Sequence, residues 1–195
     1  MTGAPEAKAR RALSDPPGGV LLWLVVGLEL LTFGIVFVLV AVERSRDPAL
    51  FAAGQAALDI RFGLGLTVLL VTSGALAAEA VHRYRRADAA GARRLFLGAG
   101  ALGVGFVAVK IADYAKHASL GHGLGASDFW DAYLLATGFH FLHVLVGLAL
   151  LFGVAARVGR ANFTDAETAI VGSALFWHLC DVAWFFLFPI FFVKA

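Results

Sequence analysis

The sequence contains little cysteine, proline or charge. Among its 195 residues there are one cysteine and five prolines, and charged residues make up 15%, well below the usual quarter. Because Cys180 stands alone, an internal disulfide framework is excluded. The net charge of +2 leaves no basic face that would indicate a nucleic-acid partner. Phosphate loops, G-x-S-x-G elbows and zinc motifs are also missing, so no familiar soluble catalytic class is indicated.

Apolar residues dominate the chain. They make up 60% of it, and the mean hydropathy is +0.81. A helix needs about 20 mostly apolar residues to cross the hydrocarbon, and continuous runs favour helices over alternating barrel strands. Five stretches qualify: 19–42, 62–81, 95–114, 132–156 and 169–193. The sequence therefore predicts an all-α polytopic membrane protein, a bundle of five transmembrane helices forming one domain over residues 19–195.

The first 18 residues form a polar tail that carries Lys8, Arg10 and Arg11. The apolar stretch that follows is longer than the 7–15 residues of a signal-peptide core, so we expect it to remain as an anchor. The tail and the loops expected on its side of the membrane carry ten lysines and arginines, against five on the other side. By the positive-inside rule, we predict a bacterial inner-membrane protein with a cytoplasmic N-terminus and a periplasmic C-terminus.

Ionisable side chains occur inside the predicted spans, where each costs about 2.5–3.5 kcal/mol on insertion scales. Helical spacing of three or four residues brings side chains onto one face. This spacing predicts a structural ion pair between Lys110 and Asp113 and a hydrogen bond between His178 and Asp181. It also places His140 and His143 together, whereas Glu29 is a single carboxylate in the first span.

These residues leave several interpretations open. His140, His143 and His178 are candidate haem ligands of a b-type cytochrome, or ordinary buried histidines. Glu29 is a candidate proton site, a lipid or ion contact, or a protonated hydrogen-bond donor. Tryptophans 23, 177 and 184 are interpreted as packing residues or interfacial anchors, and Gly147 as a point of close approach for a helix or a lipid chain. A small transporter would be expected to show an inverted repeat, which five unequal spans do not.

Four segments follow a specific pattern of residues. Residues 23–29 form an aromatic-led run that ends in a membrane carboxylate. Residues 105–114 combine Gly-Phe with Lys-Ile-Ala-Asp-Tyr. The most specific segment, 137–147, reads Thr-Gly-Phe-His-Phe-Leu-His-Val-Leu-Val-Gly, and 177–184 reads Trp-His-Leu-Cys-Asp-Val-Ala-Trp. In order and spacing, these segments resemble subunit III of the haem-copper oxidases, with Asp113 where that family more often has glutamate.

The resemblance implies a subunit III without the first two helices of the longer family members. It implies a non-catalytic subunit of a proton-translocating oxidoreductase of aerobic electron transport, of the cytochrome c oxidase type. Haem and copper would belong to a catalytic subunit I, against which this chain docks together with subunit II. No metal or cofactor is expected in this chain itself, although bound phospholipid is. The alternative within the family is the accessory subunit of nitric oxide reductase.

The resemblance also implies roles for individual residues. Glu29 corresponds to a buried carboxylate linked to lipid binding and to proton uptake by the catalytic subunit. The polar residues His140, His143, His178 and Asp181 are carried over with it as lipid-related or proton-related positions.

Overall fold

The computed structural model describes residues 19–160, 163 and 165–194 and shows an all-helical chain there. The predicted polar tail, including Lys8, Arg10 and Arg11, lies outside the described residues. The helices are α2 (Val20–Arg46), α3 (Pro48–Ala57), α4 (Ile60–Arg85), α5 (Ala89–Ser119), α6 (Asp128–Arg157) and α7 (Ala166–Phe192).

Five of these helices, all except α3, are long and apolar enough to cross a membrane. The prediction of an all-α, five-span membrane bundle is confirmed. The helices run past the predicted spans because their ends depend on capping, whereas the predicted ends depend on hydropathy. For example, the Asp88 carboxylate accepts a 2.8 Å hydrogen bond from the Gly91 amide at the start of α5, satisfying one of the unpaired amides of the first turn.

The sequence does not predict helix α3, because ten residues are too few to span the bilayer and the apolar pattern there is short. Asp47 caps it by accepting from the Leu50 amide at 2.9 Å, and Pro48 begins it. Its buried Gln55 donates to the carbonyl oxygens of Ile190 at 2.9 Å and Val193 at 3.2 Å. Those carbonyls lie at the open end of α7, so α3 caps the last membrane helix.

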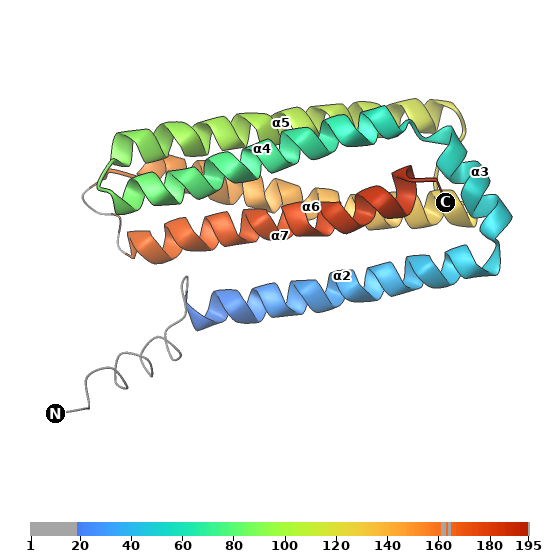
Figure 1. The fold of residues 1–195 in the computed structure, drawn as a ribbon, viewed down its shortest axis with the longest axis horizontal. Coiled ribbons are helices and arrows are strands. Elements are labelled where there is room, and N and C mark those ends of the chain that lie inside the picture. Colours follow the sequence, from blue (N-terminus) through green and yellow to red (C-terminus); the bar gives the residue numbers. More distant parts are fainter. Residues whose placement is uncertain (1–18, 161–162, 164, 195) are drawn as a thin grey trace.

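The four helices α4 to α7 form a closed bundle, with α4 and α5 on one side and α6 and α7 on the other (Figure 1). Small residues bring its helices together. The Ser73 hydroxyl of α4 donates to the Ala99 carbonyl of α5 at 2.7 Å. A Cβ at Gly103 would lie 2.7 Å from both Leu148 and Trp177, so this glycine admits α6 and α7 against α5.

Helix α2 lies apart from this bundle, along the side formed by α6 and α7 (Figure 1). Only 11% of its apolar stretch is buried, whereas at least 33% is buried in every other span. Its fully buried side chains are Phe33 and Val40. Val36 and Phe37 pack partly against the core, and most of the other apolar side chains of α2 are exposed.

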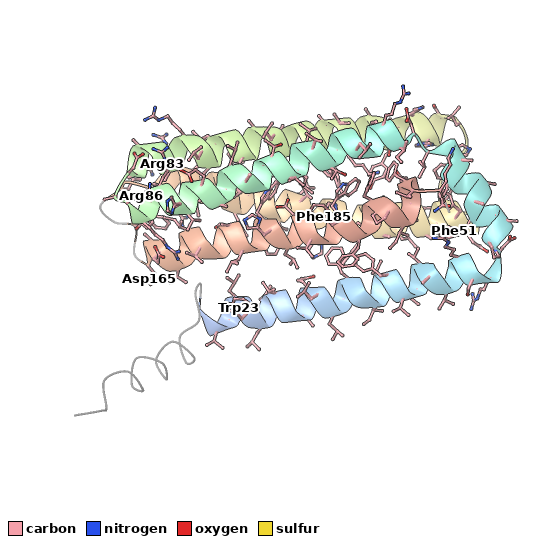
Figure 2. The ribbon with its side chains drawn as sticks, in the orientation of Figure 1. Trp23, Phe51, Arg83, Arg86, Asp165 and Phe185 are labelled. Carbon is pink, nitrogen blue, oxygen red and sulfur yellow. The ribbon has the colours of Figure 1, made fainter. Side chains whose placement is uncertain are left out.

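The two ends of the bundle differ in character. One end has the α4–α5 turn and the start of α7, with Arg83, Arg86 and Asp165 (Figure 2). There Arg85 bonds Glu167 across helices at 2.9 Å. The other end has α3, with Phe51, and the C-terminus (Figures 1 and 2). Successive membrane helices therefore alternate in direction, as a polytopic chain requires.

Candidate functional site

A carboxyl group and an imidazole meet between α2 and α6. The Glu29 Oε2 atom lies 2.9 Å from His143 Nε2, and the two side chains are 23% and 13% exposed. The Phe33 ring lies over His143, with centroids 5.2 Å apart. The Glu29–His143 pair is thus a polar contact between α2 and the bundle, and one of the two α6 histidines supplies the partner for the membrane carboxylate.

The hydrogen bonds of His143 limit which proton arrangements are compatible with this contact. Its Nδ1 lies 2.8 Å from the Phe139 carbonyl oxygen, which can only accept, so Nδ1 carries a hydrogen. The Nε2 atom then either accepts from a protonated Glu29 or donates, as part of an imidazolium, to a Glu29 carboxylate. Both arrangements place one proton between the two side chains.

Two apolar grooves between α2 and the bundle flank the Glu29–His143 pair. Groove A, about 810 Å³, is lined by residues 19–25 at the start of α2, by the end of α6 and by the start of α7. Groove B, about 530 Å³, lies between residues 36–46 of α2 and residues 128–139 of α6. Along both helices, Glu29 and His143 fall between the two lined segments. The pair is therefore a polar contact between two grooves that lie toward opposite ends of the bundle.

The mouths of the grooves carry charge. Arg157 lines groove A at the end of α6. Groove B ends among Glu43, Arg46, Asp128 and Asp131. Two smaller grooves of about 200 Å³ lie on the α7 side of α2, and Trp23 and His178 both line one of them.

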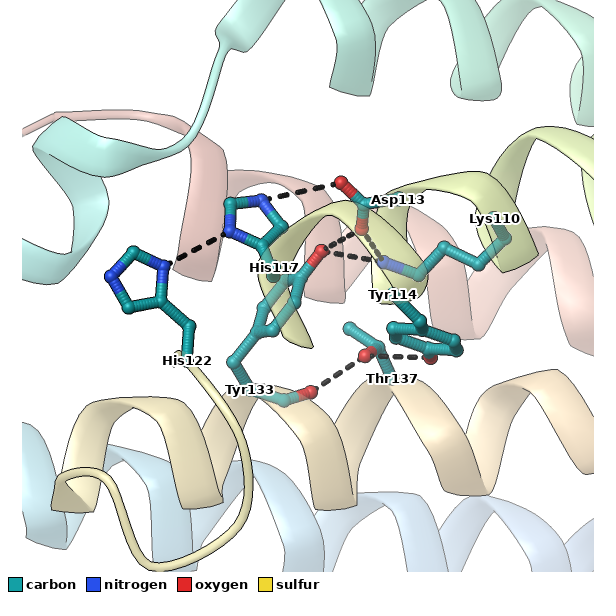
Figure 3. Close-up of polar contacts among 7 residues, drawn as sticks. All are labelled: Lys110, Asp113, Tyr114, His117, His122, Tyr133 and Thr137. Carbon is teal, nitrogen blue, oxygen red and sulfur yellow. Dashed lines mark hydrogen bonds and ion pairs between the residues drawn. The ribbon is translucent and has the colours of Figure 1, made fainter. Parts of the chain in front are cut away.

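A second polar cluster lies at the α3 end of the bundle, around the predicted ion pair (Figure 3). The Lys110 ammonium lies 2.9 Å from Asp113 Oδ2 and 2.6 Å from the Tyr133 hydroxyl. Tyr133 donates to the same carboxylate oxygen at 2.5 Å. Lys110 and Asp113 are 1% and 5% exposed at the side chain, so the pair is buried between α5 and α6.

Further groups extend this cluster (Figure 3). The Tyr114 hydroxyl donates to Thr137 Oγ1 at 2.9 Å, and Thr137 donates to the Tyr133 carbonyl at 2.6 Å. On the opposite side, Asp113 Oδ1 lies 3.4 Å from His117 Nε2. Sequence reasoning missed Tyr133 and His117. A histidine four residues after an aspartate on one helix was the available signal for His117, whereas Tyr133 comes from another helix.

Helix α7 contributes the remaining polar residues. His178 Nδ1 lies 3.0 Å from Asp181 Oδ2, and Gly74 of α4 makes room for that carboxylate, which takes up the space that a Cβ would need. Trp184 donates to Thr67 of α4 at 2.9 Å. The polar face of α7 therefore meets α4, and His178 also lines the small groove beside α2.

The other residues singled out from the sequence pack within the bundle. His140 Nε2 lies 3.0 Å from the Cys180 carbonyl oxygen, so His140 contacts α7 while His143 contacts α2. Trp177 and Trp184 are buried, and Trp23 is 47% exposed. A Cβ at Gly147 would lie 2.7 Å from Trp177. The close neighbour of Gly147 in the structure is thus helix α7.

The family comparison decides among the classes that the sequence left open. Residues 54–195 match the family model described as cytochrome c oxidase subunit III. The chain belongs to the cytochrome c oxidase subunit III family. This confirms the resemblance drawn from the four motifs, three of which lie inside the matched region.

Curated relatives of the cytochrome c oxidase subunit III family extend the likeness to α2. The quinol oxidase subunit 3 of Bacillus spizizenii is 30% identical over 171 residues, covering 85% of this chain and 81% of the relative. The cytochrome c oxidase subunit 3 of Corynebacterium diphtheriae is 29% identical over 194 residues, covering 96% and 95%. The probable cytochrome c oxidase subunit 3 of Mycobacterium bovis is 28% identical, covering 88% and 84%.

The cytochrome c oxidase subunit III family lacks redox centres of its own. The histidines considered as haem ligands have other partners here: His140 contacts the Cys180 carbonyl, His143 contacts Glu29, and His178 contacts Asp181. Among the residues that the structure describes, no three or more histidine, cysteine, aspartate and glutamate side chains gather in a group that could hold a metal ion.

Proposed function

We propose that this chain is the non-catalytic subunit III of a respiratory haem-copper oxidase and supports the catalytic subunit through lipid binding and proton supply. Subunit I, with its haem and copper, would be its main partner, together with subunit II. The observation that carries the proposal is the Glu29–His143 pair, which lies between two apolar grooves.

The grooves support the lipid-binding part of this proposal. Because α2 touches the bundle at few points, acyl chains can lie against both α2 and α6 without breaking a packed core. Arg157 at the mouth of groove A suits the phosphate of a phospholipid, since guanidinium groups bind phosphate oxygens through paired hydrogen bonds. Bound lipid would then fill the space between α2 and the bundle and hold α2 in place.

The proton-related part rests on the protonation of the Glu29–His143 pair. A group that keeps one proton inside the hydrocarbon can take up and release that proton as its surroundings change. In this proposal, the pair accepts protons from the cytoplasmic side and thereby helps to sustain proton uptake during turnover. His140, His178 and Asp181 would act as positioning residues, because their contacts hold α7 against α4 and α6.

The orientation proposed for the chain is the one predicted from its charges. The end with Arg83, Arg85 and Arg86 would face the cytoplasm, together with the N-terminus. The end with α3 and the C-terminus would face the periplasm of a bacterial inner membrane. Groove A would then open toward the inner leaflet and groove B toward the outer leaflet.

Affinity purification in mild detergent, with mass spectrometry and a visible spectrum, tests the partner. We expect a large haem-copper subunit to co-purify and the haem absorption to follow that subunit. A chain that elutes alone would contradict the oxidase assignment. If it also carried haem, the membrane cytochrome interpretation would replace it.

Substitution of Glu29 tests the role of the pair. Gln keeps a hydrogen-bonding side chain but cannot release a proton, and Ala removes both. We expect Glu29→Gln and Glu29→Ala to assemble normally but to lose oxidase activity faster during sustained turnover, as followed by oxygen consumption. Glu79→Gln is the matched control, because Glu79 is a half-exposed carboxylate on α4 paired with Arg83. Inactivation of both Glu29 variants at the wild-type rate would refute the proposed role.

A further inference from the structure

Two histidines lie side by side where α5 ends and the α5–α6 loop begins. His117 Nδ1 lies 3.3 Å from His122 Nδ1 (Figure 3). Neither residue belongs to the Glu29–His143 pair or to the grooves. His117 is buried, whereas His122 is partly exposed in a loop that contains three glycines.

The end of α5 explains why the two rings meet. The His122 amide donates to the His117 carbonyl at 2.9 Å, and the Gly121 amide donates to the Ala118 carbonyl at 3.1 Å. Gly121 has a φ of +79°, in the left-handed region that favours glycine. These features define a Schellman motif, in which the third residue from the helix end and the second residue beyond the C-cap are brought into contact. Here those two positions are His117 and His122.

Trp130 of α6 fixes the orientation of both rings. The His122 ring stacks on the indole at 4.2 Å with an angle of 11°. The His117 ring lies 4.8 Å from the same indole. Since one aromatic surface supports both imidazoles, their facing nitrogens are held in place by the fold, and a ligand would not have to organise them.

We propose that His117 and His122 form a two-histidine site for a divalent transition-metal ion of the zinc type, completed by water. Zinc binds histidine nitrogen at 2.0–2.1 Å, so two ligands on one edge of a tetrahedron lie about 3.3–3.4 Å apart. The observed 3.3 Å separation matches that edge. Without an ion, the same contact is a hydrogen bond between the two rings.

The surroundings of His117 favour the same chemistry. Its Nε2 faces Asp113 Oδ1 at 3.4 Å, and a proton on Nε2 directed at this carboxylate leaves the Nδ1 lone pair facing His122. Metal-ligating histidines commonly direct their second nitrogen at a carboxylate in this way. A bound ion would fasten the α5–α6 loop to the end of α5. This goes beyond the proposed function and departs from the expectation of a metal-free chain, although zinc brings no redox centre.

Zinc titration of the purified full-length chain tests the site. The protein would carry a streptavidin-binding tag instead of polyhistidine, and zinc affinity would be measured in competition with a chromophoric chelator. We expect wild type to bind one zinc ion, and His122→Ala to bind it at least tenfold more weakly. His82→Ala is the matched control, because His82 is exposed near the end of α4, at the opposite end of the bundle. The zinc affinity of this variant should equal that of wild type.

The variant His117→Ala and extended X-ray absorption fine-structure spectroscopy of bound zinc provide second measurements. His117→Ala should lose affinity as His122→Ala does, and the spectrum of wild type should show two imidazole nitrogens near 2.0–2.1 Å. If wild type binds no zinc, or if His122→Ala binds it as tightly as wild type, the contact is only a hydrogen bond between rings and the proposal fails. Neither result depends on oxidase activity, so the proposed function is tested separately.

Discussion

Lys110 is a cationic side chain enclosed almost completely by protein. Besides its bonds to Asp113 and Tyr133, its ammonium lies 4.6 Å and 4.4 Å from the ring centroids of Tyr114 and Tyr133. Two aromatic faces and two oxygens thus replace the water that a lysine normally binds. Burying one charge this deeply is tolerable only because the opposite charge is buried beside it.

We therefore expect Lys110→Met to destabilise the protein by about 3–5 kcal/mol, because Asp113 would remain buried without its counter-charge. The double variant Lys110→Met/Asp113→Leu should recover much of that loss. Denaturant unfolding in detergent would measure both. A single variant as stable as wild type would show that the ion pair contributes little to the fold.

For individual residues, the sequence predicts contacts within a helix better than contacts between helices. Lys110–Asp113 and His178–Asp181 follow from a spacing of three residues, and both are bonded. Glu29 and His143 are 114 residues apart, so their contact depends on how α2 lies against α6, which no local spacing encodes. For the same reason, Tyr133 could not be assigned to the ion pair from the sequence.

The helices show how position on a face decides the role of a small residue. Helix α5 contains two pairs of small residues spaced four apart, Ala99 with Gly103 and Ala101 with Gly105. Gly103 meets Leu148 and Trp177, whereas Gly105, only two residues further, has no atom within 4 Å of an added Cβ. Sequence alone gives both pairs the same weight, but only one of them faces neighbouring helices.

We expect Gly103→Ala to destabilise the bundle by about 1–3 kcal/mol, because the added methyl group overpacks the contact with Leu148 and Trp177. Gly105→Ala should leave stability unchanged or raise it by up to about 1 kcal/mol, since alanine is the better helix former. Thermal unfolding of the two variants in one detergent compares them directly. Equal effects would mean that α5 does not approach α6 and α7 as closely as the structure shows.

Helix existence and type follow from the sequence, while helix ends and the short α3 do not. Hydropathy reports the part of a helix that lies in hydrocarbon, but α5 and α6 extend beyond it to caps such as Asp88 and Ser127. Helix α3 owes its position to Gln55, whose bonds to the end of α7 link residues far apart in the chain. Such contacts are visible only once the whole bundle is assembled.

For the whole molecule, the native cysteine allows the proposed orientation to be tested. Cys180 is fully buried, so it should not react with a membrane-impermeant thiol reagent. We expect Ser119→Cys, at the α3 end, to be labelled in intact spheroplasts. Arg86→Cys, at the opposite end, should be labelled only after the membrane is opened. The reverse pattern would place the N-terminus outside and overturn the proposed orientation.

The separation of α2 from the rest has a consequence for biogenesis. Helix α2 is synthesised well before α6 and α7, the helices that it packs against. At about 5–20 residues per second, the 114 residues between Glu29 and His143 take on the order of ten seconds to translate. During that interval Glu29 has no histidine partner, because α6 has not yet been made. The contact between α2 and the bundle therefore forms late, and the docking of α2 completes the fold.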